Sequence, residues 1–199
     1  IHNGIDTSRF FLNKKFRNNF RSQYKIHKDA IVLLCVGRND PMKDHDTLIK
    51  AFKKLNSKFP SVILLLAGLG TEKIKNLNNI ITLGPRKDIE YIYSASDIII
   101  SSSAFGEGFS NALAEGMSSK LIPIATEVGD SQYILGNIGK LIKPKSIKEL
   151  YKAIEYMLEL DKDSFENQKK LARKRILNNF SQNKMISSYN KLYAEIVDK

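Results

Sequence analysis

The 199-residue sequence has one cysteine, no tryptophan and only three histidines. A lone cysteine excludes a disulfide within the chain and leaves no set of thiolates for a structural metal site. Because Cys35 lies in the apolar run 31–36, we predict a buried, unreactive thiol. The histidines have no partners at the spacing of a zinc site. We therefore expect neither a disulfide scaffold nor a zinc centre.

Long hydrophobic runs are also missing. Apolar runs such as residues 63–67 and 98–100 are far shorter than the roughly 20 residues that span a bilayer. No signal-peptide pattern opens the sequence. With 42% hydrophobic residues, we expect a cytoplasmic chain with one main core and a helical appendage.

Positive charge is in excess, with 32 Lys and Arg against 21 Asp and Glu and a net charge of +11. Such a field favours phosphate, nucleic acid or anionic lipid without choosing among them, and lysines scattered over solvated helix faces would give the same excess. The densest basic cluster includes apolar residues at helical spacing, which is compatible with peripheral contact with an anionic membrane. It consists of Lys169, Lys170, Arg173, Lys174 and Arg175.

Apolar, β-branched segments alternate with helical patterns along much of the sequence. Strands are predicted over residues 31–36, 62–67, 80–83, 97–101 and 121–125. The clearest helix lies over residues 46–58, and after Gly139 only helices are expected, over 146–160, about 163–179, and 181–197. The alternation predicts an α/β fold, a Rossmann-like doubly wound parallel sheet followed by C-terminal helices.

Ligands of such sheets bind beyond the carboxyl ends of the strands. The first strand is followed by Gly37, Arg38 and Lys43. The two cations suit a diphosphate, because Arg can bind phosphate oxygens through two hydrogen bonds while Lys supplies a mobile charge. A loop with two solvated cations and no ligand would give the same sequence pattern.

The segment Asp-His-Asp at 44–46 is similar to a metal-binding motif, but its place at a helix start favours an N-cap. Gly-Leu-Gly at 68–70 predicts a tight turn.

Residues 101–117 change from a strand into a helix near Ser110. The amide groups at the start of that helix would face the crevice and suit phosphate. Glu107 precedes the helix and Glu115 lies about one turn inside it, so one carboxylate is available for each end of a nucleotide-sugar, where it can accept hydrogen bonds from vicinal hydroxyls. Taken alone, the segment also fits a capped helix with two ordinary surface acids.

Together these motifs resemble the C-terminal domain of the family 4 retaining glycosyltransferases of GT-B fold. The resemblance rests on Arg38 and Lys43, then the glycine-containing second turn, then Glu107 and Glu115 with seven residues between them. It extends to residues 2–10 (His-Asn-Gly-Ile-Asp-Thr-Ser-Arg-Phe), 82–88, 95–97 and the terminal helices. It implies that residues 1–199 form a donor nucleotide-sugar-binding domain, with 1–10 as an interdomain linker and 146–199 as a helical C-terminal part.

The resemblance implies a role for each matching residue. Arg38 and Lys43 would bind the donor diphosphate and steady the departing phosphate, Glu107 would contact hydroxyls of the transferred sugar, and Glu115 would hold the ribose. The backbone at the helix start would line the sugar and phosphate through Gly108, Phe109, Ser110 and Asn111. The loop at Pro85 and Arg86 would meet the base.

The implied reaction is the transfer of a hexose or N-acetylhexosamine from a UDP- or GDP-sugar to a glycan or lipid-linked acceptor in surface polysaccharide biosynthesis. Retention at the anomeric carbon is expected, with no metal or other cofactor. The acceptor would bind an N-terminal domain that this sequence does not contain, so we expect the domain alone to be inactive.

The sequence departs from the family pattern in two places. At 118–123 it reads Ser-Ser-Lys-Leu-Ile-Pro, where the family usually has a small residue, Gly, and a Pro one place earlier, and Gly116 replaces a common Ala. Another GT-B enzyme, such as a nucleotide-sugar epimerase or a phosphorylase, remains an alternative, although the histidine and carboxylate groups or the lysine-bound cofactor that these need are not evident. A basic nucleic-acid-binding module is supported by charge alone, so no nucleic acid is expected as a partner.

Overall fold

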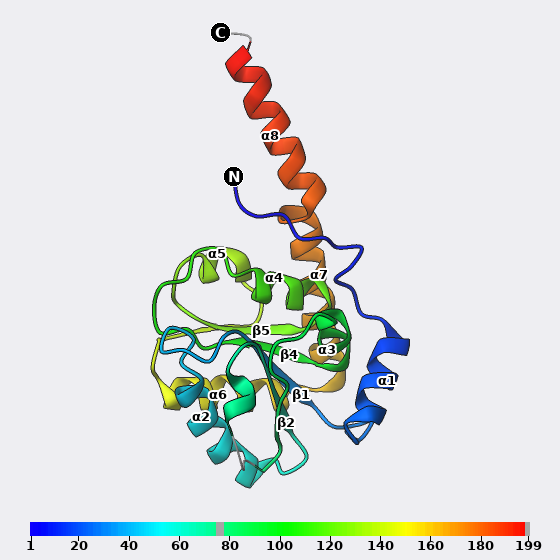
Figure 1. Cartoon of the computed structure of the whole chain (residues 1–199), viewed down its shortest axis with the longest axis vertical. Helices are drawn as coiled ribbons and strands as arrows, with labels where there is room; N and C mark the ends of the chain where they lie inside the picture. The colour runs from blue at the N-terminus through cyan, green and yellow to red at the C-terminus, as the bar shows by residue number, and fades with distance from the viewer. Residues whose placement is uncertain (75–77, 198–199) are drawn as a thin grey trace.

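The computed structural model describes residues 1–74 and 78–197 (Figure 1), so that 75–77 and 198–199 of the predicted domain lie outside the described residues. The described residues form a six-stranded parallel sheet in the order β3-β2-β1-β4-β5-β6. Its strands are β1 (Val32–Val36), β2 (Ile63–Ala67), β3 (Ile80–Thr82), β4 (Ile98–Ser101), β5 (Ile122–Thr126) and β6 (Lys140–Ile142). The predicted α/β class and parallel sheet are confirmed.

Helices cover both faces of this sheet. They are α1 (Lys14–Gln23), α2 (His45–Lys58), the short 3-10 helix η1 (Thr71–Lys73), α3 (Ile89–Ala95), α4 (Asn111–Ser118), α5 (Ser131–Leu135), α6 (Ile147–Leu158), α7 (Lys162–Asn179) and α8 (Gln182–Val197). One face carries α2 and α6, and the other carries α1, α3, α4, α5 and α7 (Figure 1).

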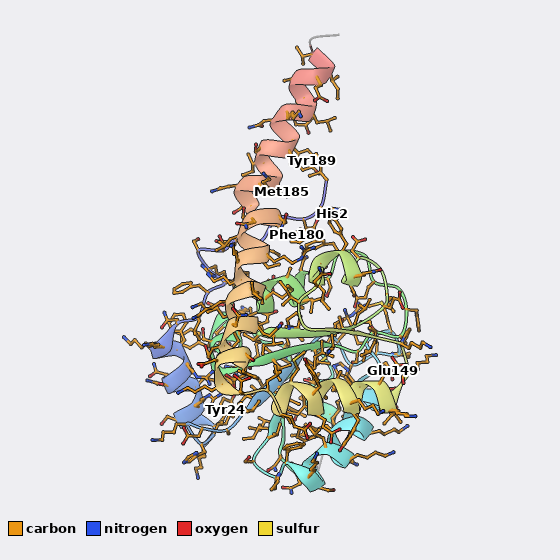
Figure 2. All side chains as sticks on the ribbon, turned by 180° about the vertical axis from the view of Figure 1, so that it is seen from behind. His2, Tyr24, Glu149, Phe180, Met185 and Tyr189 are labelled. Atoms are coloured by element: carbon orange, nitrogen blue, oxygen red, sulfur yellow. The ribbon has the colours of Figure 1, made fainter. Side chains whose placement is uncertain are left out.

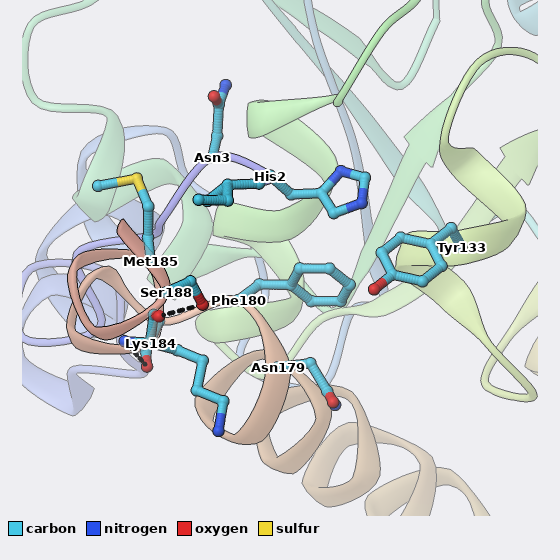
Figure 3. Close-up of a pocket in the computed structure, with 10 residues that line it drawn as sticks. His2, Asn3, Tyr133, Asn179, Phe180, Lys184, Met185 and Ser188 are labelled. Atoms are coloured by element: carbon cyan, nitrogen blue, oxygen red, sulfur yellow. Dashed lines mark hydrogen bonds between the residues drawn. The ribbon is translucent and has the colours of Figure 1, made fainter. Parts of the chain in front are cut away.

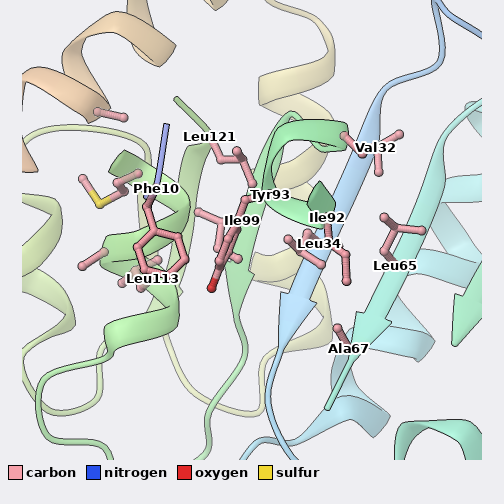
Figure 4. Close-up of a cluster of buried hydrophobic side chains, with 14 of the residues drawn as sticks. Phe10, Val32, Leu34, Leu65, Ala67, Ile92, Tyr93, Ile99, Leu113 and Leu121 are labelled. Carbon is pink, nitrogen blue, oxygen red and sulfur yellow. The ribbon is translucent and has the colours of Figure 1, made fainter. Parts of the chain in front are cut away.

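Alternation along the strands divides the apolar residues between two cores. In β1, Leu33 and Cys35 face α2 and α6, while Val32 and Leu34 face the opposite layer (Figure 4), because successive strand residues point to opposite faces. Cys35 is buried as predicted, and burial raises the pKa of its thiol to about 11. The thiol is therefore protonated at neutral pH and unreactive.

All five predicted strands are present, but the expectation that strands stop after Gly139 was wrong. Residues 140–142 form β6, which pairs in parallel with β5 at the edge of the sheet. Three residues, one of them Lys140, are too few to show an alternating pattern. Helices were expected between the strands, but no ranges were predicted for α1, α3 or α5.

The end of the chain stands away from the body of the protein. Figures 1 and 2 show α8 projecting beyond the other helices, with Met185 and Tyr189 labelled along it. None of its described residues is buried, and its exposed apolar side chains are Ile186, Tyr189, Leu192, Tyr193, Ile196 and Val197. Within the described part of the chain, no helix has the length and apolar character needed to cross a membrane.

Residues 1–10 have no regular structure except one bridge, between Ile5 and Ser181. They are nevertheless tied to the junction of α7 and α8. The Ile5 amide donates to the Phe180 carbonyl at 2.7 Å, and the Gln182 amide donates to the Ile5 carbonyl at 2.9 Å. The segment predicted as a linker therefore packs against the base of α8.

A buried ion cluster lies just before β4. Asp97 accepts hydrogen bonds from Arg17 at 2.9 Å, from Arg21 at 2.8 Å and from the Val32 amide at 3.0 Å. The Lys169 ammonium lies 3.7 Å from the same carboxylate. Because Lys169 is buried here, it does not belong to an exposed basic surface on α7.

Two other cations of the predicted basic cluster also point inward. Arg173 donates to the carbonyls of Phe10 and Ser118, and Arg175 donates to those of Ile134 and Tyr133. Only Lys170 and Lys174 of the five are exposed. The helical spacing predicted one basic face, whereas the packing of α7 divides these cations between interior and solvent.

Candidate functional site

The order of the strands reverses between β1 and β4, which are neighbours in the sheet. At such a point the loops after the two strands diverge and leave a crevice at the carboxyl edge. Two hydrogen bonds hold these loops together: the Ala104 amide donates to the Met42 carbonyl at 2.7 Å, and the Ser102 hydroxyl donates to the Lys43 carbonyl at 2.8 Å. The two loops are the ones that carry the predicted cations and Glu107.

Lys43 and Glu107 form an ion pair across this point, between Nζ and Oε1. The Ser103 hydroxyl donates to the same carboxylate oxygen. The aliphatic part of Lys43 passes over Gly37, where an added Cβ would lie 3.0 Å from Lys43 Cδ. Both charged side chains are largely covered, with exposures of 18% for Lys43 and 8% for Glu107. The two predicted site residues are thus brought into direct contact.

Gly129 supports the loop that carries Glu107. Its φ is +56°, and an added Cβ would lie 2.2 Å from the Glu107 carbonyl oxygen, which leaves room only for glycine. The Asp130 amide donates to the Gly108 carbonyl at 3.2 Å. A Cβ added at Gly108 would meet nothing within 4 Å, so this backbone is open on its other side. Gly108 was predicted from the sequence, whereas Gly129 and Asp130 were not.

Helix α4 begins directly after this loop, with Ser110 at the N-cap position. Ser110 is buried, and its side chain makes no cap hydrogen bond to the amides of the first turn. The amides at the start of a helix carry partial positive charge and suit an anion when no side chain caps them. The predicted start of the helix near Ser110 is confirmed, and phosphate binding there stays a prediction.

Phe109 and Asn111 connect the start of α4 to residues 1–10. The Phe109 ring lies 5.4 Å from that of Phe180 and 5.9 Å from that of His2, and the Asn3 side-chain amide donates to Asn111 Oδ1 at 3.1 Å. Figure 3 shows His2, Phe180 and Tyr133 around a pocket of about 260 Å³ at this junction. The partly buried Phe109 side chain therefore packs in this aromatic cluster.

Glu115 lies half-buried one turn inside α4, beside a second pocket of about 360 Å³ that Asn3, Asp6 and Asn111 also line. Burial raises the pKa of its carboxyl above the ordinary value, while the Tyr93 hydroxyl and the charge of Arg9 act in the opposite direction. Tyr93 donates to Glu115 Oε2 at 2.9 Å.

The structure does not bring every predicted residue into contact with Lys43 or Glu107. Arg38 is 65% exposed, and its Nε lies 3.2 Å from Asp40 Oδ2. Arg86 makes two hydrogen bonds to Asp88, at 2.8 and 2.7 Å, and a third to the Tyr24 hydroxyl at 3.1 Å. Pro85 is exposed in the same loop after β3.

The segment at 44–46 has the predicted N-cap. Asp44, with a φ of +48°, accepts a hydrogen bond from the Thr47 amide at 3.2 Å. His45 is buried, and desolvation lowers the pKa of its imidazole. Over residues 1–74 and 78–197, no three His, Cys, Asp or Glu side chains are grouped in a way that suits a metal ion.

Comparison with known proteins gives consistent matches. The sequence matches the family described as "Glycosyl transferases group 1" over residues 16–175. An uncharacterized glycosyltransferase of Methanocaldococcus jannaschii is 32% identical over 187 residues, which cover 86% of this chain and 47% of that protein. The chain therefore spans about half the length of this curated relative.

Solved structures agree with the fold. The crystal structure of a glycosyltransferase from Rickettsia africae ESF-5 superposes with a TM-score of 0.87 at 27% identity, covering 99% of this chain and 56% of that one. Anabaena HepE, solved in complex with UDP and glucose, superposes with a TM-score of 0.83 at 21% identity, covering 100% of this chain and 56% of that one.

Proposed function

Because the chain belongs to the group 1 glycosyltransferase family of GT-B type, we propose that it is the donor-binding domain of a retaining, family 4 glycosyltransferase. The domain spans residues 1–199, with 1–10 as an interdomain linker and 146–199 as its helical C-terminal part. The observation that carries the proposal is the Lys43–Glu107 pair, which lies where the strand order reverses and beside an uncapped helix start. HepE, with a similar fold, was solved with UDP and glucose, which supports UDP as the donor nucleotide.

Lys43 and the start of α4 bind the diphosphate of the donor. The ammonium is paired with Glu107 on the loop that leads into α4, and ammonium and first-turn amide groups both stabilise phosphate oxygens. Arg38, on the same exposed loop, supplies a second cation once it leaves Asp40. The charge on the leaving phosphate grows in the transition state, so these cations also accelerate transfer.

Glu107 accepts hydrogen bonds from hydroxyls of the transferred hexose or N-acetylhexosamine, and Glu115 accepts them from the ribose. The backbone of residues 108–111 lines the space between the two carboxylates. The loop at Pro85 and Arg86 meets the base.

Transfer breaks the bond between the anomeric carbon and the phosphate oxygen, and it forms the bond to the acceptor oxygen on the same face of the sugar. The proton of the acceptor hydroxyl passes to the departing phosphate. No metal takes part in this scheme.

The acceptor, a glycan or lipid-linked sugar in surface polysaccharide biosynthesis, binds residues outside this chain. The match over 47% of a curated relative supports this division. The chain alone transfers no sugar, since an open crevice admits water and no group orients an acceptor. The whole enzyme is cytoplasmic, and the exposed Lys170 and Lys174 contribute to a peripheral contact with anionic lipid.

A thermal-shift panel tests the proposal. UDP, GDP, ADP and their sugars are added to the chain in parallel with Mg²⁺ and with EDTA, and at least one nucleoside diphosphate raises the midpoint of unfolding in both buffers. Absence of a shift with every nucleotide would overturn the proposed donor site. A shift that disappears only on chelation would overturn metal independence and point back to residues 44–46.

A further inference from the structure

Tyr93 is a fully buried side chain in the hydrophobic cluster that α3 and α4 share with one face of the sheet (Figure 4). It comes from α3, and its ring packs edge-on against Phe10, with 5.7 Å between ring centroids and an interplanar angle of 86°. Its hydroxyl has two acceptors on α4, the Glu115 carboxylate at 2.9 Å and the Ala112 carbonyl at 3.2 Å. Packing fixes the ring, so the position of the hydroxyl relative to α4 is fixed as well.

We propose that Tyr93 is a positioning residue of the donor site, whose hydroxyl holds the Glu115 carboxylate in the orientation that receives a ribose hydroxyl. The inference rests on the proposed function, in which Glu115 binds ribose. The hydrogen bond occupies Oε2 of Glu115, which directs Oε1 to the ligand. Preorganisation of this kind lowers the entropic cost of binding, since the hydrogen bond restricts the carboxylate before the ligand arrives.

The same hydrogen bond acts on the charge of Glu115. Both oxygens of a carboxylate accept hydrogen bonds, whereas one oxygen of a carboxylic acid carries a proton and acts as a donor. Burial raises the pKa of Glu115, and the Tyr93 bond lowers it. Arg9, which also lowers it, is paired with Glu90 at 3.0 Å, and Asp6 lines the same pocket. Burial raises the pKa of Tyr93 well above its ordinary value, so its hydroxyl remains a donor.

Calorimetry with UDP and its 2′-deoxy and 3′-deoxy analogues tests the inference. Parent chain, Tyr93→Phe and Tyr91→Phe are compared; Tyr91 lies on the same helix but stacks on Phe16, 3.8 Å away, so its variant is the matched control. The parent binds UDP more tightly than at least one deoxy analogue. Tyr93→Phe reduces that preference by about tenfold, the effect expected for one hydrogen bond to a charged group. Tyr91→Phe leaves the preference unchanged.

The pH dependence of UDP affinity is the second readout. Removal of the hydroxyl raises the pKa of Glu115. On acidification, the affinity of Tyr93→Phe for UDP therefore begins to fall at a higher pH than that of the parent. Replacement of Tyr93 by fluorotyrosine, a stronger donor of the same shape, moves the profile the opposite way and serves also if Tyr93→Phe does not fold. A purely structural role would weaken UDP and its deoxy analogues equally and leave the profile in place.

The experiment distinguishes failure of the positioning role of Tyr93 from failure of the proposed donor-binding function. Parent binding with an unchanged preference and an unchanged pH profile in both Tyr93 variants overturns the positioning role alone. Failure of the parent to bind any nucleotide overturns the proposed function and the ribose role together.

Discussion

Lys43 and Glu107 are 64 positions apart in the sequence and form an ion pair between the loops that follow β1 and β4. The cation assigned to the diphosphate is therefore held by the carboxylate assigned to the sugar. A donor that enters this site replaces contacts within the pair by contacts with its own phosphate and hydroxyl groups. Removal of either partner should therefore have a different effect on the bare nucleotide and on the nucleotide-sugar.

Glu107→Gln removes the carboxylate that holds Lys43 and keeps its size. We expect UDP to bind as tightly as to the parent or more tightly, because the ammonium has lost its competing partner, whereas the advantage of a UDP-sugar over UDP is lost. Calorimetry with both ligands measures this difference. Glu127→Gln, at an exposed acid after β5, is the control. If Glu107→Gln weakens UDP as strongly as Glu115→Ala does, the assigned orientation of the donor is wrong.

Glu115→Gln should change the pH dependence of stability. The folded pKa of Glu115 is raised, so between the unfolded and folded pKa values the native chain binds more protons than the unfolded one. Stability contributed by this group is thus lost as pH rises through that window. The variant, which cannot ionise, should gain stability relative to the parent between acidic and neutral pH, as measured by urea unfolding.

Glu155→Gln should change the pH dependence of stability in the opposite direction. Hydrogen bonds from Lys58 and Tyr151 lower the pKa of Glu155, so its contribution is present at neutral pH and lost as pH falls. Its variant should therefore approach the stability of the parent on acidification. Identical pH profiles for both variants would show that neither carboxyl has the environment described.

Asp97→Ala should destabilise the fold strongly without a direct effect on the donor site. It leaves Arg21 buried without its carboxylate, and breaking a buried pair costs about 3–5 kcal/mol. Glu90→Ala removes the more exposed pair with Arg9 and should cost at most about 1 kcal/mol. Chemical unfolding of both variants measures the two costs, and equal losses would contradict a structural role for the Asp97 cluster.

Lys120→Gly should stabilise the chain by about 1 kcal/mol. Lys120 follows α4 with a φ of +66°, and the Leu121 amide donates to the Gly116 carbonyl at 3.0 Å in the pattern of a Schellman turn, where glycine is preferred. Lys152→Gly, in the exposed interior of α6, should lose a similar amount. A higher unfolding midpoint for the first variant and a lower one for the second would support this account, and a loss in both would contradict it.

Two departures from the family pattern, Lys120 and Gly116, lie at backbone positions with special conformational or packing requirements. Lys120 occupies the left-handed position where the family usually has glycine. Gly116 is packed on β4 so closely that an added Cβ would lie 2.9 Å from the Cβ of Ile99. The common alanine would not fit here unless Ile99 moved.

The sequence predicted the central strands because short runs of consecutive apolar residues between turn signals favour a buried strand, whereas β6 is too short to give a pattern. It also placed Lys43 and Glu107 after the correct strands. Their contact was not predictable, because it depends on how the loops dock through Met42 and Ala104. Tyr93 has the sequence pattern of an ordinary core residue, and only the hydrogen bond from its hydroxyl to Glu115 indicates a role at the donor site. For the same reason, helical spacing gave no sign that Lys169 turns inward to Asp97.

Calorimetric titration of UDP into the parent chain and Lys43→Ala, both in EDTA, tests the central claim most directly. Lys50→Ala, on the exposed face of α2, is the matched control. If Lys43 binds the donor diphosphate, its variant loses about 1.5–3 kcal/mol of binding free energy, which is tenfold or more in affinity, and the control retains the parent's affinity. Equal affinity of the parent and Lys43→Ala for UDP would contradict the account.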